Sequence, residues 1–417
     1  MATSKISFFK TYLKGLKFSD YILCLLLILI PIYNKLMPLT LVLFFFSAIP
    51  NRISFQAFIN NLNPKLPAFW FLCFFLFHII GMSYTQNTAI GWNDIASKLS
   101  FLIIPILLAA TKIKLSLKQI CDVFLVGLFF SCIFAFSYAS YRSLIHAENN
   151  NWAYFKESYL SFSMHRSYYA TYLVFGIIIS VRRLFMNRWY LIPTLFLVST
   201  LFLTYSKAGI LIFMILIIPV IFFGFYNLNR RLFAYSISIL IPLLFFCLIM
   251  LSPTLKNRFT WMINSFNNPS LSNNFESNQT RIIMWQASLA VIKDSPIIGH
   301  GTGEVNEVLS NYNLKVGNKI HAEKKFNSHN QYLNTTIQLG ILGLIPLIVI
   351  FYTSLSKSLK TKNIEFSYLI IIIFLTMLFE SFLQTQAGII PVTLLFVLFS
   401  IKSNSSENIN SDTILSS

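Results

Sequence analysis

Long apolar segments joined by short basic connections run through most of the chain and restrict it to a membrane fold. Hydrophobic residues make up 56% of the sequence and charged residues only 11%, whereas about a quarter of the residues in a soluble domain are charged. Many windows exceed the roughly 18 apolar residues that a bilayer-spanning helix needs. The alternation typical of membrane β-barrels is absent from them. We therefore expect an all-α polytopic membrane protein.

The apolar segments predict about 12 transmembrane helices. The chain then divides into spans one to nine (1–251), a large polar loop with short helices (252–329), spans ten to twelve (330–402) and a Ser/Asn-rich tail (403–417) that we expect to be disordered. No small-residue cleavage site follows the first span, which favours an uncleaved anchor. The predicted spans are 20–33, 37–50, 67–82, 97–110, 119–141, 167–181, 189–204, 207–224, 233–251, 330–353, 366–382 and 388–401.

Basic residues predict the orientation of the chain. With a cytoplasmic N-terminus, the cytoplasmic segments hold 18 Lys or Arg residues and the short outer connections hold 6. This is the excess that cytoplasmic loops carry. We expect both termini inside and the large loop outside. The net charge of +18 does not indicate nucleic-acid binding, because it is spread over the ends of apolar segments. All five cysteines lie inside apolar segments, so neither disulfides nor a metal site is predicted.

The large loop contains one segment with helical periodicity, 280–292. Its apolar residues recur at helical spacing, and Asp294-Ser295-Pro296 is expected to end the helix. The helix is too short to span, so we expect it on the membrane surface or on the bundle. Arg281 lies in its first turn, where a cation opposes the helix dipole. It either reaches water or is held there to meet an anion. The apolar stripe is Ile282, Trp285, Leu289 and Ile292.

A glycine-rich turn follows this helix. Gly299, Gly301 and Gly303 alternate with other residues, and such backbone allows amides to approach a phosphate closely. The Lys-Ser/Thr pair of a P-loop is missing, so a tight turn after a helix is the competing interpretation.

His329 stands at the outer end of the tenth span and begins a polar stripe. Asn330, Asn334 and Gln338 follow at intervals of four, so they share one helix face. Polar groups at this depth are costly against lipid and should point into the bundle. His329 is either a catalytic or binding residue above this stripe or an interfacial histidine with its polar tip in water.

The region 190–345 resembles the superfamily of O-antigen ligases, O-antigen polymerases and O-oligosaccharyltransferases. Three sequence patterns carry the resemblance. They are His329-Asn330 followed by Gly340 and Gly343; Arg281, Trp285, Pro296, Gly299 and Gly301 in the loop; and 203–209, where Ser206-Lys207 stands in the place of the family's Ser-Arg.

The resemblance implies a GT-C-like glycosyltransferase of the bacterial inner membrane that uses no metal or other cofactor. Its donor would be a glycan on undecaprenyl diphosphate, and its acceptor lipid A–core, another glycan or a protein. His329 takes the position of the catalytic His, and the adjacent Asn330 is predicted to bind substrate. Arg281 and Lys207 take those of the diphosphate contacts, although Lys cannot bind phosphate bidentately as Arg does. The large loop would then be periplasmic. From its place near the membrane surface alone, Lys207 could equally be snorkelling to the interface.

Several other residues are weaker candidates. His165 and Arg166 either line the cavity or anchor the sixth span at the interface. Glu380 either pairs with a cavity cation or sits at the interface. Asp94 and Lys98 are spaced to pair with each other.

An O-antigen ligase is the leading interpretation, and three alternatives remain open at this point. A polymerase or a protein O-glycosylating transferase would share the chemistry of an O-antigen ligase and differ in the acceptor. A lipid-linked glycan flippase would suit twelve spans but would not need a large loop that ends in a His.

Overall fold

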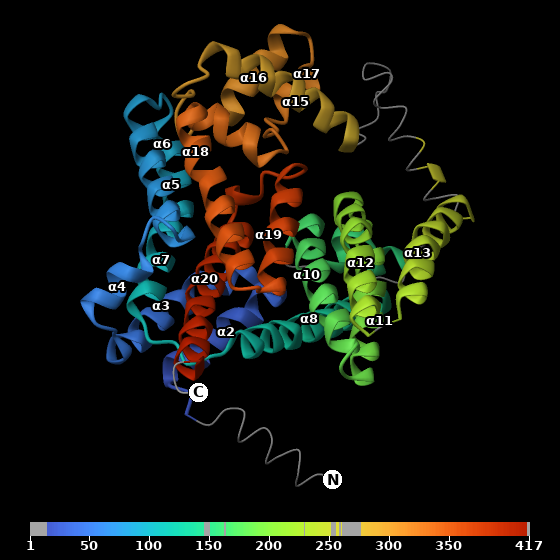
Figure 1. Ribbon diagram of the computed structural model, residues 1–417. Helices are drawn as coiled ribbons and strands as arrows, with labels where there is room; N and C mark the ends of the chain where they lie inside the picture. The colour runs from blue at the N-terminus through green and yellow to red at the C-terminus, as the bar shows by residue number, and fades with distance from the viewer. Residues whose placement is uncertain are drawn as a thin grey trace.

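Helices form nearly all of the structure, a computed structural model that describes residues 15–145, 151–161, 164–228, 230–251, 256–257, 260 and 277–414 (Figure 1). Within these ranges no strand forms, and one isolated bridge joins Arg52 and Thr111. The all-α expectation is therefore confirmed. The α-helices are α2 (Phe18–Ile32), α3 (Met37–Ala48), α4 (Phe55–Asn61), α5 (Pro67–Gly81), α6 (Thr88–Lys98), α7 (Ser100–Ala110), α8 (Leu117–Ile145), α9 (Glu157–Leu160), α10 (Arg166–Leu184), α11 (Leu191–Leu203), α12 (Lys207–Asn227), α13 (Arg231–Leu251), α15 (Ser277–Asp294), α16 (Val305–Lys315), α17 (Lys319–Glu323), α18 (Gln331–Lys360), α19 (Ile364–Met377) and α20 (Gln386–Ile414). The 3-10 helices are η1 (Asn34–Leu36), η2 (Ile49–Asn51), η3 (Met82–Tyr84), η4 (Asn151–Phe155), η5 (Arg188–Tyr190) and η6 (Phe382–Gln384).

Six helical segments of the described chain are long and apolar enough to cross a membrane. They are Pro67–Tyr84, Thr88–Ala110, Leu117–Ile145, Lys207–Asn227, Gln331–Lys360 and Gln386–Ser403. Each of the twelve predicted spans falls on a helix, but the number that crosses the bilayer stays a prediction. Helix α20 continues to Ile414, so the tail is helical over much of the stretch for which the sequence predicts disorder.

Two helices form the centre of the bundle. Residues 167–181 of α10 and 387–400 of α20 are buried without a break. The outer helices instead expose large apolar side chains, among them Phe46, Leu195 and Ile239. Removing such a side chain from water is worth about 1.5–3 kcal/mol, so this exterior suits lipid.

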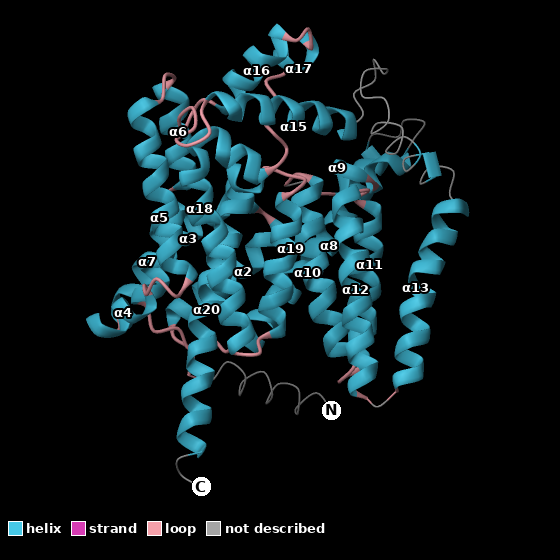
Figure 2. Cartoon of the chain, turned by 45° about the horizontal axis from the view of Figure 1, so that its top comes forward, coloured by secondary structure: helices cyan, strands magenta, loops and turns pink. Residues whose placement is uncertain are grey.

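Helices α15, α16 and α17 cap one end of the bundle, and α20 ends at the opposite end (Figure 2). Helix α15 ends at Asp294, as predicted, and packs on α18 and α16. The predicted stripe is wrong in part, because Leu289 is exposed. The apolar residues of α15 are spread around the helix, and α16 and α18 cover only one side of it. The buried cluster consists of Met284, Ala287, Val291, Val305, Leu309 and Ile337.

Helix α18 is broken at Gly340, and the segment 296–301 fills the break. Gly340 has φ 64° and ψ −164°, a conformation that is essentially confined to glycine. The amides of Ile341 and Leu342 donate to the carbonyls of Pro296 and Ile297, at 2.9 and 3.3 Å. Non-helical backbone at membrane depth is tolerated when other protein groups satisfy it in this way.

Candidate active site

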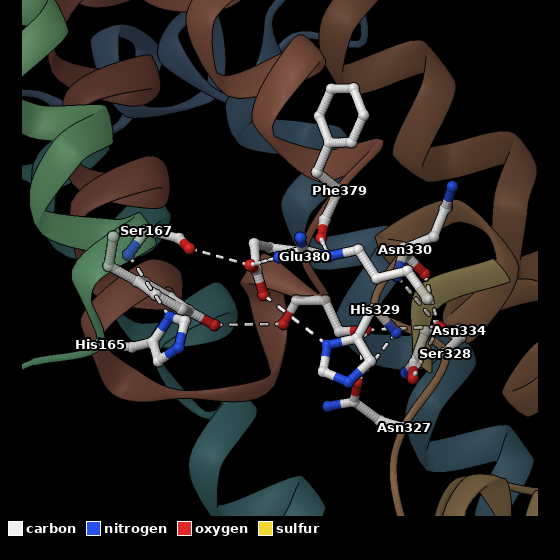
Figure 3. Close-up of polar contacts among 12 residues, drawn as sticks. His165, Ser167, Asn327, Ser328, His329, Asn330, Asn334, Phe379 and Glu380 are labelled. Atoms are coloured by element: carbon white, nitrogen blue, oxygen red, sulfur yellow. Dashed lines mark hydrogen bonds and ion pairs between the residues drawn. The ribbon is translucent and has the colours of Figure 1, made fainter. Parts of the chain in front are cut away.

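Glu380 is the centre of a cluster of charged and polar groups at the capped end of the bundle (Figure 3). It lies just beyond the end of α19, and its side chain is 8% exposed. Its Oε1 accepts a hydrogen bond from Arg281 Nη2 at 2.5 Å and another from Ser167 Oγ at 2.9 Å. Arg281 also donates from Nε to the carbonyl of Phe379 at 3.1 Å. The cluster thus joins α15, α10 and the turn after α19.

His329 reaches the same carboxylate from the start of α18. Its Nδ1 lies 3.9 Å from Glu380 Oε2, close enough to form an ion pair when the imidazole is protonated. The backbone of His329 has a φ of 49°, a left-handed conformation that is uncommon outside glycine and often found at functional sites. Its amide donates to Asn327 Oδ1 at 2.9 Å, which helps to hold this conformation. The side chain is 27% exposed, so the imidazole is also open to a ligand.

The charges around Glu380 keep it ionised. Burial alone would raise the pKa of Glu380, but His329 and Arg281 outweigh this effect and lower the pKa to about 2. A carboxylate that stays negative in this position stabilises positive charge on its neighbours. It can therefore orient an imidazole and stabilise positive charge that develops on that ring during a reaction.

Asn330, predicted to bind substrate, is the N-cap residue of α18. Its Oδ1 accepts from the amides of Tyr332 and Leu333 at 2.9 and 3.1 Å, and its Nδ2 donates to the carbonyl of Leu378 at 3.1 Å. The side chain thus connects the start of α18 to the end of α19. This geometry supports a role in positioning His329 beside Glu380.

His165 and Arg166 lie beside the cluster at the start of α10. His165 caps the helix by accepting from the amide of Ser167 at 3.4 Å. Burial lowers the pKa of His165, and the nearby Glu380 partly opposes this shift. Arg166 pairs with Glu157 of α9 at 3.5 Å, and both side chains are partly exposed. Such a pair contributes about 1 kcal/mol or less, so an incoming anion can compete for the guanidinium.

Lys207 is the first residue of α12, a helix that packs along α10. The two helices touch near their N-terminal ends, because a Cβ at Gly209 would lie 2.5 Å from Ala170. Lys207 therefore begins its helix near the end of α10 that carries Arg166 and Ser167. The structure brings Arg281, His329 and His165 together around Glu380 and puts Lys207 at the same end of the bundle.

The turn containing Gly299 and Gly301 is used for packing. Both residues have positive φ values, 72° and 113°. The amides of His300 and Gly301 donate to the carbonyls of Ile337 and Gln338 at 2.8 and 2.9 Å, on the N-terminal side of the break in α18. A Cβ at Gly299 would lie 2.5 Å from the backbone of Gln338. These amides point at protein carbonyls, so the geometry supports the tight-turn interpretation over a phosphate cradle.

Comparison with known proteins identifies the region that contains most of these groups. Residues 192–348 match the O-antigen ligase family. This stretch, less than half of the chain, resembles an O-antigen ligase domain. Lys207, Arg281, the turn at 299–301 and His329 all lie inside the matched range, whereas His165, Arg166 and Glu380 lie outside it.

Two known proteins resemble parts of this chain. An O-antigen ligase of Escherichia coli (strain K12) is 24% identical over 227 residues, which cover 52% of this chain and 51% of that protein. An uncharacterised protein of Haemophilus influenzae (strain ATCC 51907 / DSM 11121 / KW20 / Rd) is 36% identical over 89 residues, 20% of this chain and 22% of that protein. The matched stretches thus span about half of one relative and less of the other.

The sequence offers two interpretations of Glu380 and gives no indication of Ser167. Their partners are far apart along the chain, so no local pattern reports them. A single acid near the end of an apolar segment was the available signal, because such a group needs a partner. In the described part of the chain, no three His, Cys, Asp or Glu side chains gather as metal ligands.

Proposed function

We propose that this protein is an inverting, metal-independent glycosyltransferase that moves a glycan from undecaprenyl diphosphate to a hydroxyl group of lipid A–core. The observation that carries the proposal is the Glu380 carboxylate, which lies between the imidazole of His329 and the guanidinium of Arg281. The family of residues 192–348 and the apolar helices support a membrane transferase.

His329 acts as the general base in this mechanism. An imidazole, with an unperturbed pKa near 6.5, can take the proton of the acceptor hydroxyl near neutral pH. The proton ends on His329 as the hydroxyl oxygen attacks the sugar carbon. Glu380 holds the ring and stabilises the imidazolium that forms, as the carboxylate does in a catalytic triad. One direct displacement inverts the configuration of that carbon.

Arg281 stabilises the leaving diphosphate. Its Nε–H and one Nη2–H are used in the bonds to Phe379 and Glu380. A guanidinium has five N–H donors, so three remain for phosphate oxygens. Arg166 and Lys207 add positive charge at the same end of the bundle. The developing negative charge is stabilised by these cations, and no covalent enzyme intermediate is required.

The general-base role is tested with the purified chain, a lipid-linked glycan donor and an acceptor, without nucleotide or added metal. We expect His329→Ala to lose transfer. His321→Ala is the matched control, because His321 lies on α17 and is not among the groups around Glu380. Full glycan transfer by His329→Ala would refute the role, and equal losses in both variants would point to a general effect of His removal. Product formation by the wild-type protein alone would exclude a flippase.

The acceptor is tested in cells by gel analysis of lipopolysaccharide from a deletion strain. Loss of the entire O-antigen ladder supports the ligase. A single repeat on the core would indicate a polymerase, and an unchanged ladder would indicate a protein or other glycan acceptor.

A further inference from the structure

A cleft rich in lysine lies at the end of the bundle opposite α15–α17. It has a volume of about 550 Å³ and lies between the α4–α5 connection and the last three turns of α18. Figure 2 shows α4 at the end of the bundle away from α15, α16 and α17. The cleft is therefore separate from the cluster around Glu380. It is lined by Asn60, Asn63, Pro64, Lys65, Leu66, Trp70, Val349, Tyr352, Thr353, Ser356, Lys357 and Lys360.

The charged residues among the described residues that line this cleft are all lysines. Three lysines line it, and no Asp or Glu is among its described lining residues. Lys65 and Lys360 are exposed, whereas Lys357 is only 9% exposed. The ammonium groups of Lys65 and Lys360 at this cleft repel each other, so an anion between them is favourable. A phosphate group fits this charge and the neighbouring Asn63 and Ser356 side chains can add hydrogen bonds.

The surroundings of the cleft suit a lipid better than a free anion. Its wall is one face of α18, and the exposed residues Ile345 and Ile348 continue this face toward the middle of the helix. Trp70 and Tyr352 line the cleft, and Tyr352 is 70% exposed beside the apolar face of α18. Aromatic residues are enriched at membrane interfaces in this way. Both α5 and α18 belong to segments that can span the bilayer. A headgroup on the lysines would thus have apolar surface beside it for acyl chains.

We propose that this cleft binds the phosphate headgroup of an anionic glycerophospholipid in the leaflet opposite the candidate active site. Basic pockets between transmembrane helices bind such headgroups through their charge. The acyl chains lie along the exposed face of α18. The proposal does not depend on the transferase function, because it concerns a separate site with its own readout.

The test is native mass spectrometry of the full chain in detergent, titrated with phosphatidylglycerol or phosphatidylcholine. We expect preferential binding of phosphatidylglycerol. The variant Lys65→Gln/Lys360→Gln changes only exposed side chains, so its fold should be retained. Each lysine near an anionic headgroup is worth about fivefold in affinity, so the double variant should bind phosphatidylglycerol about 30-fold more weakly.

The matched control is Lys112→Gln/Lys362→Gln. It removes the same charge from exposed lysines that follow α7 and α18 and do not line the cleft. We expect the control to keep wild-type affinity. Equal weakening in both double variants, or no preference for phosphatidylglycerol in the wild type, would overturn the proposal. Competition by millimolar inorganic phosphate that removes the bound lipid would also overturn it, because the site would then take a soluble anion.

Discussion

Replacement of Glu380 by glutamine separates the charge of this side chain from its shape. The carboxylate is 8% exposed and bonds Arg281 at 2.5 Å and Ser167 at 2.9 Å. Removing one partner of a buried pair costs about 3–5 kcal/mol, because the other charge stays buried and unpaired. Arg281 is 15% exposed and can recover some hydration, so we expect about 3 kcal/mol for Glu380→Gln. Chemical unfolding in detergent micelles measures this difference.

The same substitution should slow the reaction. In the proposed mechanism the imidazole of His329 accepts a proton, and without the carboxylate the imidazolium that forms has no counter-charge. General bases contribute about 100-fold to 10,000-fold, and we expect kcat for Glu380→Gln to fall by at least about 100-fold. The control is Glu157→Gln, which breaks the partly exposed pair with Arg166 and should cost about 1 kcal/mol or less.

The pH dependence of stability gives a second readout for Glu380. The pKa of Glu380 is lowered from 4.5 to about 2 in the folded protein. The ionised carboxylate therefore stabilises the fold fully above pH 4.5, and this contribution is lost as the pH falls toward 2. The stability difference between wild type and Glu380→Gln should narrow over that window. Wild-type stability and kcat in Glu380→Gln, or a difference that is constant across the window, would refute the reasoning.

Three further predictions concern other parts of the chain. Arg281→Ala should lose more transfer activity than Arg281→Lys, which keeps the charge; wild-type rates in both would remove Arg281 from the site. Gly340→Ala should lower the midpoint of thermal unfolding far more than Gly317→Ala. Both positions have a positive φ, where a side chain costs about 1–2 kcal/mol. A Cβ at Gly340 would also lie 2.0 Å from the carbonyl oxygen of Ile297, whereas one at Gly317 meets nothing within 4 Å. Similar midpoints would contradict the tight packing at the break. Lys98→Met should destabilise the protein by about 3–5 kcal/mol, because Asp94 loses the fully buried ammonium group that it pairs with. The double variant Lys98→Met/Asp94→Asn should recover part of that loss in the same unfolding assay. No recovery would argue against the pair.

The sequence predicts the helices well because composition alone determines where the chain can enter a bilayer. It also predicts the pairing of Asp94 with Lys98, which are one helical turn apart and form the expected ion pair. Helical spacing also predicts that Asn334 and Gln338 share one face that points into the bundle, and both side chains are buried.

The sequence predicts contacts between distant segments poorly. Arg281 and Glu380 lie 99 residues apart, and helical periodicity carries no information about that distance. Gly299 and Gly301 have the local pattern of an anion-binding turn, but the carbonyls that receive the amides belong to α18. Local sequence specifies which conformations a turn can adopt, whereas the partner of each amide depends on the tertiary fold.

The break in α18 has a mechanical consequence. Four backbone hydrogen bonds join the segment 296–301 to the two sides of Gly340. This segment therefore connects the two parts of α18 across the break, and it follows directly after α15 in the chain. A displacement of α15 would therefore be passed through these hydrogen bonds to the N-terminal segment of α18, which begins two residues after His329.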